Sequence, residues 1–236
     1  MKPVLVLQHM VDDGPAYLGR WLQQQGLPAD VRCHQAGQPF PATLHGYRAM
    51  AILGGPMSAN DDMPHLRQAE QLVREGVASG IPVIGHCLGG QLMARALGGT
   101  VGPSIAPEIG WHDITLHDNA TAQTWFGDVR AARVYRWHYE AFSVPAGALA
   151  LAASPACVHQ AFALGPHLAL QFHVEQDLAK MKEWLAAAGD GYVRSLRLHP
   201  ASVQAAQPML AEAEQSLAAQ QALASRIYHY WLASAA

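Results

Sequence analysis

The cysteine at position 87 stands where a nucleophile could be held on a tight turn. It lies in Gly85-His86-Cys87-Leu88-Gly89, after the apolar run IPVIG and before a helical pattern. A nucleophile flanked by glycines between a strand and a helix is typical of a nucleophile elbow. The N-terminus of the following helix would point at the sulfur and favour the thiolate. The alternative is structural, because two glycines and a small cysteine can simply pack a strand–helix corner.

A thiol nucleophile needs a base, and the base needs an acid that orients it. Two His-x-Glu triplets could supply both, His138 with Glu140 and His173 with Glu175. In an extended segment residues i and i+2 face the same way, so each carboxylate could lie beside its imidazole. The second triplet follows the buried-strand pattern LALQF, whose end would lie beside the elbow in a central strand, and this favours it. The first triplet is flanked by aromatic residues and stays open as the alternative.

The apolar pattern predicts the elements that would position these side chains. Short apolar runs predict strands at 3–8, 29–34, 47–56 and 81–85, with helices at 15–26, at 64–80 and from residue 88. Closely spaced strand-like segments follow at 108–116, 133–138, 148–154, 158–164 and 167–173, and helices at 177–189 and about 205–233. We expect a single α/β domain whose mostly parallel or mixed sheet is covered by helices on both faces.

Composition narrows the class of protein. The chain has 236 residues, of which 50% are hydrophobic and 14% are charged, as in a globular protein. A formal net charge of -3 without a Lys/Arg cluster gives no reason to expect nucleic acid as a partner. The three cysteines are far apart and form no CxxC pair, which is typical of a reducing compartment rather than of disulfides or zinc. The N-terminal apolar run is too short for a signal peptide, and we expect a cytoplasmic protein without membrane spans.

Six sequence blocks occur in one order over about 120 residues: GGPMSANDD, GHCLGGQLMARALGG, EIGW, WHYEAF, SPACVHQAF and LQFHVE. Together they resemble the class I, triad-type glutamine amidotransferases. Within that family the chain is most similar to stand-alone members that resemble the glutaminase domain of GMP synthetase. The resemblance implies a flavodoxin-like α/β fold, with a helical C-terminal extension at about 190–236.

The resemblance also implies which groups would do the chemistry. The catalytic triad would be Cys87, His173 and Glu175, which decides between the two His-x-Glu triplets. The oxyanion hole would be formed by the backbone N–H groups of Gly55 and Leu88.

The same resemblance implies residues that contact the substrate. Gln91 matches the glutamine that holds the amino-acid end of the substrate in this family. Trp137, His138 and Tyr139 match a loop whose backbone contacts that same end. Glu108 matches a further motif position near the cleft.

Two positions depart from the family pattern. The residue before the nucleophile is usually apolar or small, and here it is His86. Because adjacent residues on a sharp turn point apart, we expect His86 to be a packed or hydrogen-bonded neighbour of the pocket and not the base. The loop that often reads Trp-His-Gly-Asp reads Trp-His-Tyr-Glu here, and Tyr139 adds bulk where the amino-acid end should dock. This change counts against free glutamine as the substrate.

The implied activity is hydrolysis of the side-chain amide of glutamine or of a γ-glutamyl amide. It would proceed through a cysteinyl thioester, release ammonia or an amine, and need no metal or other cofactor. The chain has no P-loop, so a synthetase that uses the ammonia would be a separate partner protein. The alternatives are a catalytically silent regulatory or binding module on the same fold, and a related cysteine hydrolase or peptidase. The stripe RIYHYWL predicts packing of a C-terminal helix on the core, with an oligomer contact as the other interpretation.

Overall fold

A nine-stranded mixed sheet runs through the molecule, with its strands in the order β2-β1-β3-β4-β9-β8-β7-β5-β6. The computed structural model describes residues 1–235. The parallel part consists of β1 (Val4–Gln8), β2 (Ala29–Cys33), β3 (Ala49–Ile52), β4 (Val83–His86) and β9 (His167–Leu170). The antiparallel part consists of β5 (Val101–Leu116), β6 (Ala131–Phe142), β7 (Leu149–Ala153) and β8 (Ala161–Leu164).

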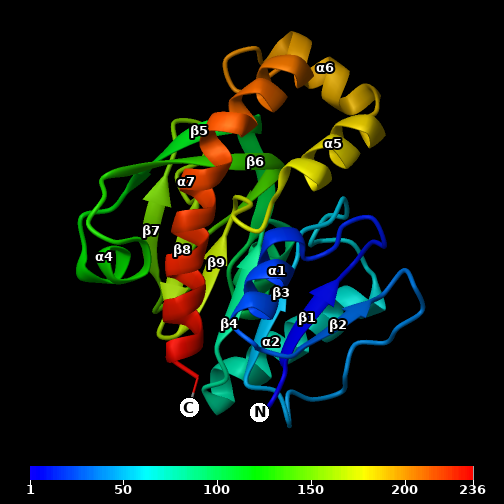
Figure 1. Cartoon of the computed structure of the whole chain (residues 1–236), viewed down its shortest axis with the longest axis vertical. Helices are drawn as coiled ribbons and strands as arrows, with labels where there is room; N and C mark the ends of the chain where they lie inside the picture. The colour runs from blue at the N-terminus through cyan, green and yellow to red at the C-terminus, as the bar shows by residue number, and fades with distance from the viewer. Residues whose placement is uncertain (236) are drawn as a thin grey trace.

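Helices cover both faces of this sheet (Figure 1). They are α1 (Ala16–Gln24), α2 (Pro64–Ser79), α3 (Leu88–Ala96), α4 (Ala120–Phe126), α5 (Leu178–Ala187), α6 (Asp190–Leu198) and α7 (Ala206–Ala233). Helices α1, α4 and α7 contribute to one hydrophobic cluster, and α2 and α3 contribute to another. The prediction of a single α/β domain with a mixed sheet covered on both faces is therefore confirmed.

Strand β1 shows why its first four residues, VLVL, are all apolar. Val4 and Val6 pack into the cluster beneath α1 and α7, whereas Leu5 and Leu7 pack into the cluster beneath α2 and α3. Successive side chains of a strand point to opposite faces, so these four residues all face a hydrophobic layer, whereas Gln8 at the carboxyl end of the strand donates to the carbonyls of Met10 and Val11. The run VLVL thus places β1 in the interior of the sheet.

Helix α2 begins and ends where the sequence predicts. Pro64 occupies the first turn, where its missing N–H costs no hydrogen bond. Gly80 takes a left-handed conformation with φ 69° and donates its N–H to the carbonyl of Gly76. This C-terminal cap directs the chain back into the sheet as β4.

Two short helices were not predicted individually: α4 was missed, whereas α6 lies within the C-terminal segment that was expected to be helical. Helix α4 has seven residues, and its start is capped by Asn119, whose side chain accepts from the N–H of Ala122. Helix α6 has nine residues and begins with Gly189 in the capping position, directly after α5. Together α5 and α6 lie at one end of the molecule, next to β6 (Figure 1). They pack on β5 and β6 through a third cluster that includes Ile109, Tyr135 and Met181.

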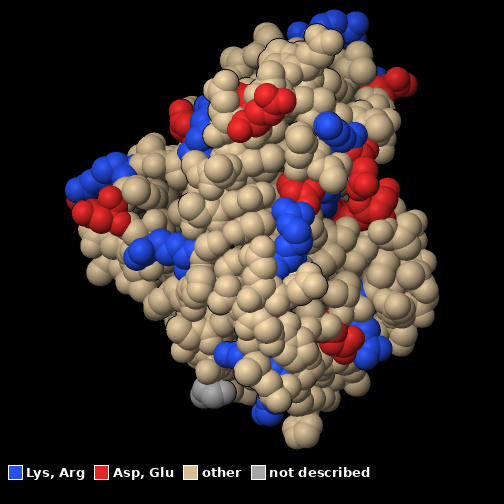
Figure 2. Space-filling model, viewed as in Figure 1, with Lys and Arg blue, Asp and Glu red and all other residues tan. Residues whose placement is uncertain are grey.

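Charged side chains are scattered over the face of the molecule that Figure 2 shows, with basic and acidic residues intermixed. No helix within residues 1–235 is long and apolar enough to cross a membrane.

Candidate active site

Cys87 occupies the sharp turn between β4 and α3. Its backbone has φ 49° and ψ -106°, and Ala16 is the other non-glycine residue with a positive φ in the described chain. Such a conformation costs on the order of 1–3 kcal/mol and persists only where surrounding structure enforces it. Here the N–H of Cys87 donates to the carbonyl of Leu170 at 2.8 Å, so the turn is tied to the end of β9.

The flanking glycines are required by the close approach of α3 to the sheet. A Cβ at Gly89 would lie 2.2 Å from the carbonyl oxygen of Ile52, and one at Gly90 would lie 2.6 Å from that of Leu170. A Cβ at Gly85 would lie 2.5 Å from the backbone carbonyl carbon of Gly89. The glycines therefore let the first turn of α3 rest on β3 and β9, which fixes the sulfur at the carboxyl edge of the sheet.

His173 and Glu175 lie together behind this sulfur. The Nδ1 atom of His173 is 2.7 Å from Oε1 of Glu175, and both side chains are buried. The N–H of His173 donates to the carbonyl of Tyr135 at 2.9 Å, so β6 holds the segment that follows β9. With Nδ1 bonded to the carboxylate, Nε2 is the ring nitrogen left for proton transfer.

The charges of this group are coupled. Burial alone would lower the pKa of His173, but Glu175 and Cys87 stabilise the imidazolium and raise that pKa to about 10. Burial alone would raise the pKa of Glu175, but His173 and His86 lower it to about 2. At neutral pH the arrangement is therefore a carboxylate beside an imidazolium that lies next to the Cys87 sulfur.

The other triplet does not pair in this way. The Nε2 atom of His138 is 3.1 Å from Oε2 of Glu108, and Glu140 instead accepts a hydrogen bond from the Ser58 hydroxyl at 2.8 Å. The reason is the antiparallel register of β5 and β6, which sets Glu108 directly opposite His138. The expectation that His138 could be oriented by Glu140 is therefore wrong.

Glu108 lies behind the cavity and not on its surface. Its buried carboxylate accepts from Arg136, from Gln160 Nε2 at 2.6 Å and from the Ser154 hydroxyl at 2.8 Å, in addition to His138. Burial opposes ionisation, but the bond to His138 and the charge of Arg136 outweigh it and lower the pKa of Glu108. Glu108 is therefore not placed to contact substrate as expected, because its carboxylate oxygens accept hydrogen bonds that join β5 to β6 and to the loop before β8.

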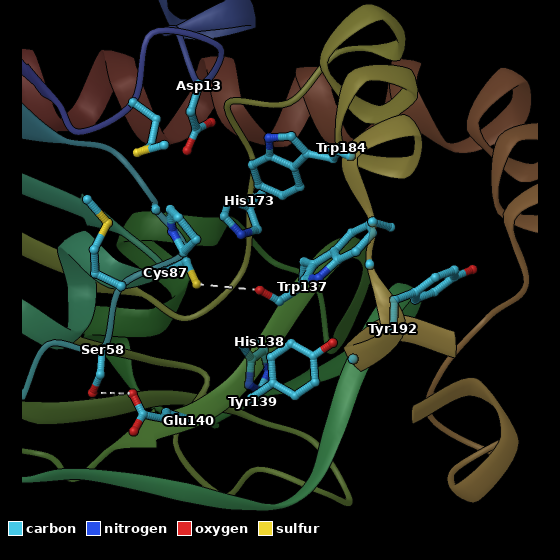
Figure 3. Close-up of a pocket in the computed structure, with 18 of the residues that line it drawn as sticks. Asp13, Ser58, Cys87, Trp137, His138, Tyr139, Glu140, His173, Trp184 and Tyr192 are labelled. Carbon is cyan, nitrogen blue, oxygen red and sulfur yellow. Dashed lines mark hydrogen bonds between the residues drawn. The ribbon is translucent and has the colours of Figure 1, made fainter. Parts of the chain in front are cut away.

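A cavity of about 750 Å³ opens above Cys87 (Figure 3). Its wall includes the expected residues Gly55, Gln91, Trp137, His138, Tyr139 and His173. Sequence reasoning missed Asp12 and Ser58, together with Trp184 of α5 and Tyr192 of α6. The only sequence signal for the last two is their place in helical segments just after the histidine-bearing strand.

Two amide side chains, Gln91 and Gln171, lie against each other, and the second contacts the sulfur of Cys87. Gln91 donates from Nε2 to the carbonyl of Glu140 at 3.0 Å and so links α3 to β6 across the cavity. Gln171, which the sequence did not single out, donates from Nε2 to Sγ of Cys87 at 3.6 Å. The sulfur also lies 3.7 Å from the carbonyl oxygen of Trp137 (Figure 3).

The two residues expected to supply the oxyanion-binding N–H groups, Gly55 and Leu88, are in contact. Leu88 is the first residue of α3, so its N–H has no partner within the helix. A Cβ at Gly55 would lie 3.0 Å from Cδ2 of Leu88, and one at Gly54 would lie 3.0 Å from Cε1 of His173. The Gly54–Gly55 segment therefore contacts both the Leu88 side chain and the imidazole of His173.

His86 points away from the cavity. It is buried, its Nε2 lies 3.9 Å from Oε2 of Glu175, and the same atom is 3.3 Å from the Tyr228 hydroxyl of α7. Burial lowers the pKa of His86, so the ring is neutral at pH 7. His86 is therefore a packed neighbour of the pocket, as expected, and it lies between Glu175 and Tyr228 of α7.

No group of three or more His, Cys, Asp or Glu side chains within residues 1–235 is arranged to hold a metal ion.

Comparisons with known proteins agree with this geometry. The family model for class-I glutamine amidotransferases matches residues 18–188. The glutamine amidotransferase-like protein YfeJ of Salmonella typhimurium is 27% identical over 83% of this chain and 88% of its own length. A glutamine-hydrolysing GMP synthase subunit of Saccharolobus solfataricus is 31% identical over 63% of this chain and 78% of its own length.

A solved structure extends the similarity to the whole fold. The crystal structure of a glutamine amidotransferase from Methylobacillus flagellatus superposes with a TM-score of 0.94 and 34% sequence identity, covering 100% of this chain and 96% of that one. The family match spans the elbow, the histidine-bearing segment and most of the cavity wall. The chain therefore belongs to the class-I glutamine amidotransferase family.

Proposed function

We propose that this protein hydrolyses the side-chain amide of glutamine or of a γ-glutamyl amide, with Cys87 as the nucleophile. Membership of the glutamine amidotransferase family supports hydrolysis of such amides in general. The observation that supports the specific mechanism is the arrangement of Cys87, His173 and Glu175 at the base of one large cavity.

In the first step the Cys87 thiolate attacks the amide carbonyl carbon and forms a tetrahedral intermediate. The N–H groups of Leu88 and Gly55 donate to its oxyanion, a contribution of about 3–4 kcal/mol for one such donor in acyl-transfer enzymes. His173, which is an imidazolium at neutral pH, gives its Nε2 proton to the leaving nitrogen as the carbon–nitrogen bond breaks. Ammonia or an amine departs, and the glutamyl group stays on Cys87 as a thioester.

In the second step water hydrolyses the thioester. His173 is now neutral and accepts a proton from the attacking water, while the new oxyanion occupies the same two N–H groups. Collapse of the intermediate breaks the carbon–sulfur bond, releases glutamate and restores the thiolate–imidazolium pair. Glu175 holds the ring of His173 through Nδ1 in both steps and compensates its charge in the first.

The test is turnover by the purified protein, followed as release of ammonia or amine from glutamine and from a set of γ-glutamyl amides. We expect release by the wild type and none by Cys87→Ala. Turnover that survives in Cys87→Ala would overturn the proposal. A folded wild type that releases nothing from any amide would instead favour a catalytically silent module, and cleavage of ordinary peptide bonds would favour a peptidase.

A synthetase that receives the ammonia would be a partner protein, as the relationship to a GMP synthase subunit suggests. Ammonia delivery predicts slow turnover by the isolated chain and faster turnover with the partner. The large cavity favours the other mode, in which the chain alone hydrolyses a γ-glutamyl amide and shows full turnover in isolation.

A further inference from the structure

Three aromatic side chains from three different elements form one wall of the cavity. They are Trp137 of β6, Trp184 of α5 and Tyr192 of α6. The ring of Trp137 lies 5.4 Å from that of Tyr192 and 5.9 Å from that of Trp184, measured between centroids. Figure 3 shows all three beside the open space to which Cys87 points. We call these three residues the aromatic wall.

The aromatic wall lies on the side from which the leaving group is protonated. Trp184 packs edge-on against His173, with centroids 4.8 Å apart and an interplanar angle of 83°. The leaving nitrogen must come close to Nε2 of His173 to receive its proton, so any substituent on that nitrogen extends toward Trp184. Ser58 and Glu140 lie on the other side of Cys87 in Figure 3, next to the amide of Gln91.

The cavity is larger than glutamine needs. About ten non-hydrogen atoms of glutamine, at the roughly 30 Å³ that one water takes up in the liquid, fill about 300 Å³. The cavity measures about 750 Å³, so more than half of it would stay empty of substrate if ammonia were the leaving group. Pockets of roughly 300–1,000 Å³ commonly enclose drug-sized ligands.

The charges around the cavity restrict what the extra group can be. Asp12, Asp13 and Glu140 line it, and among residues 1–235 no lysine or arginine does. The nearby ammonium of Lys180 is 2.5 Å from Asp13 Oδ1 and also donates to the carbonyl of Gly14, so its charge is already compensated. A leaving group with its own carboxylate would add a negative charge beside Asp12 and Glu140, where no lysine or arginine lines the cavity to pair with it.

We propose that the substrate is a γ-glutamyl amide of an amine that carries an aromatic ring and no carboxylate. This inference rests on the proposed function, because it uses His173 as the proton donor to the leaving nitrogen. The ring would lie against the aromatic wall while the glutamyl part reaches Cys87. Water and the amide give glutamate and the free amine: the carbon–nitrogen bond breaks, the nitrogen takes the His173 proton, and water supplies the new carboxyl oxygen.

Three substrates test the proposal directly: γ-glutamyl-phenethylamide, γ-glutamyl-phenylalanine and glutamine. The first two differ only by one carboxylate, and the first and third differ by the aromatic substituent. We expect kcat/KM for the phenethylamide to exceed both others by at least about tenfold, or about 1.4 kcal/mol. Labelling of Cys87 by a diazo-ketone glutamine analogue, read by mass spectrometry, is measured on the same preparation.

A variant series locates the preference on the aromatic wall. In Trp184→Ala the ratio of kcat/KM for phenethylamide to that for glutamine should fall about tenfold, whereas Trp184→Phe should keep most of it. The ratio is the readout because Trp184 also contacts His173, so the absolute rates change for both substrates. Val193→Ala, at an exposed position of α6, is the matched control and should leave the ratio unchanged.

Failure of this inference and failure of the proposed function give different results. Suppose that Cys87 is labelled but glutamine or γ-glutamyl-phenylalanine is the best substrate. This result would refute the proposed aromatic amine without a carboxylate, and the proposed amide hydrolysis would still stand. A ratio that is the same in Trp184→Ala and the wild type would overturn the role of the aromatic wall. Absence of both labelling and turnover in folded protein would overturn the proposed function itself, and this inference with it.

Discussion

Replacing Glu175 by glutamine removes one charge from beneath His173 while keeping the size of the side chain. The amide oxygen can still accept from Nδ1 at the position of Oε1, which lies 2.7 Å away in the native protein. The amide nitrogen would then face Nε2 of His86, which is 3.9 Å from Oε2 of Glu175. Because burial lowers the pKa of His86, that ring is neutral, and Oε2 of Glu175 makes no hydrogen bond within residues 1–235 that the substitution would remove. The substitution therefore isolates the effect of the charge.

The expected effect on His173 follows from the opposing influences on its pKa. Burial lowers it, and Glu175 and Cys87 together raise it to about 10. Without the carboxylate, we expect burial to dominate and the pKa to fall below the ordinary value of 6.5. At pH 7.5 the imidazolium fraction would change from more than about 99% to less than about 10%. Loss of this acid and of its orientation should lower kcat by roughly 10³–10⁴-fold, as in serine hydrolases.

The assay combines turnover with the protonation state of His173, read from the ring nitrogens in a ¹⁵N NMR titration. We expect a protonated ring at pH 7.5 in the wild type and a neutral ring in Glu175→Gln. Glu140→Gln is the matched control, because Glu140 also lies at the cavity but bonds Ser58 and not His173, so the titration should stay as in the wild type. A ring that remains protonated at pH 7.5 in Glu175→Gln, or a kcat reduced less than tenfold, would refute the reasoning.

Four further outcomes follow from the same contacts. The pKa of His173 is raised and its contribution to stability is lost as pH rises through about 10, whereas that of Glu175 is lowered and its contribution is lost as pH falls through about 2. The unfolding free energy that Glu175→Gln loses, measured in urea, should therefore be largest between pH 4.5 and 6.5, and a pH-independent loss would contradict this. Cys87→Gly should be more stable than Cys87→Ala by about 1–3 kcal/mol because it relieves the positive φ, and the reverse order would exclude strain at the elbow. Gly89→Ala should lower the unfolding free energy by at least about 2 kcal/mol, because the new methyl group overpacks against Ile52. A new methyl group at Gly102 would meet nothing within 4 Å, so Gly102→Ala should lower it by less than about 1 kcal/mol, and equal losses would argue against the close approach of α3. Glu108→Gln should cost about 3–5 kcal/mol because it leaves the buried charge of Arg136 unpaired, and a near-neutral effect in chemical denaturation would contradict the assigned ion pair.

The elbow could be predicted because its causes are local. Short spacing between an apolar run, two glycines and a helical pattern fixes the turn at Cys87, and the close contacts of Gly85 and Gly89 explain why the glycines are there. A feature visible in the sequence, namely a buried strand expected to end beside the elbow, favoured His173 over His138, and the resemblance to the glutamine amidotransferases decided between them. Parallel pairing of β4 with β9 places that end where the pattern predicted.

The remaining parts of the site depend on contacts between distant segments. His138 and Glu140 have the same spacing as His173 and Glu175, but the register of β5 on β6 gives His138 a different partner, Glu108. Trp184 reaches the cavity through the packing of α5 against β6, which no periodicity in its own segment reveals. Helix α6 lies inside the C-terminal segment expected to be helical, but its own start at Asp190 and end at Leu198 were not predicted.

The central claim is that Cys87 carries the glutamyl group of the substrate. The most direct measurement is the intact mass and peptide map of the protein after incubation with a diazo-ketone analogue of glutamine. The account predicts one adduct on Cys87, no adduct in Cys87→Ala and a much slower reaction in Glu175→Gln. An adduct on Cys33 or Cys157, or no adduct on a folded protein that still hydrolyses its substrate, would contradict it.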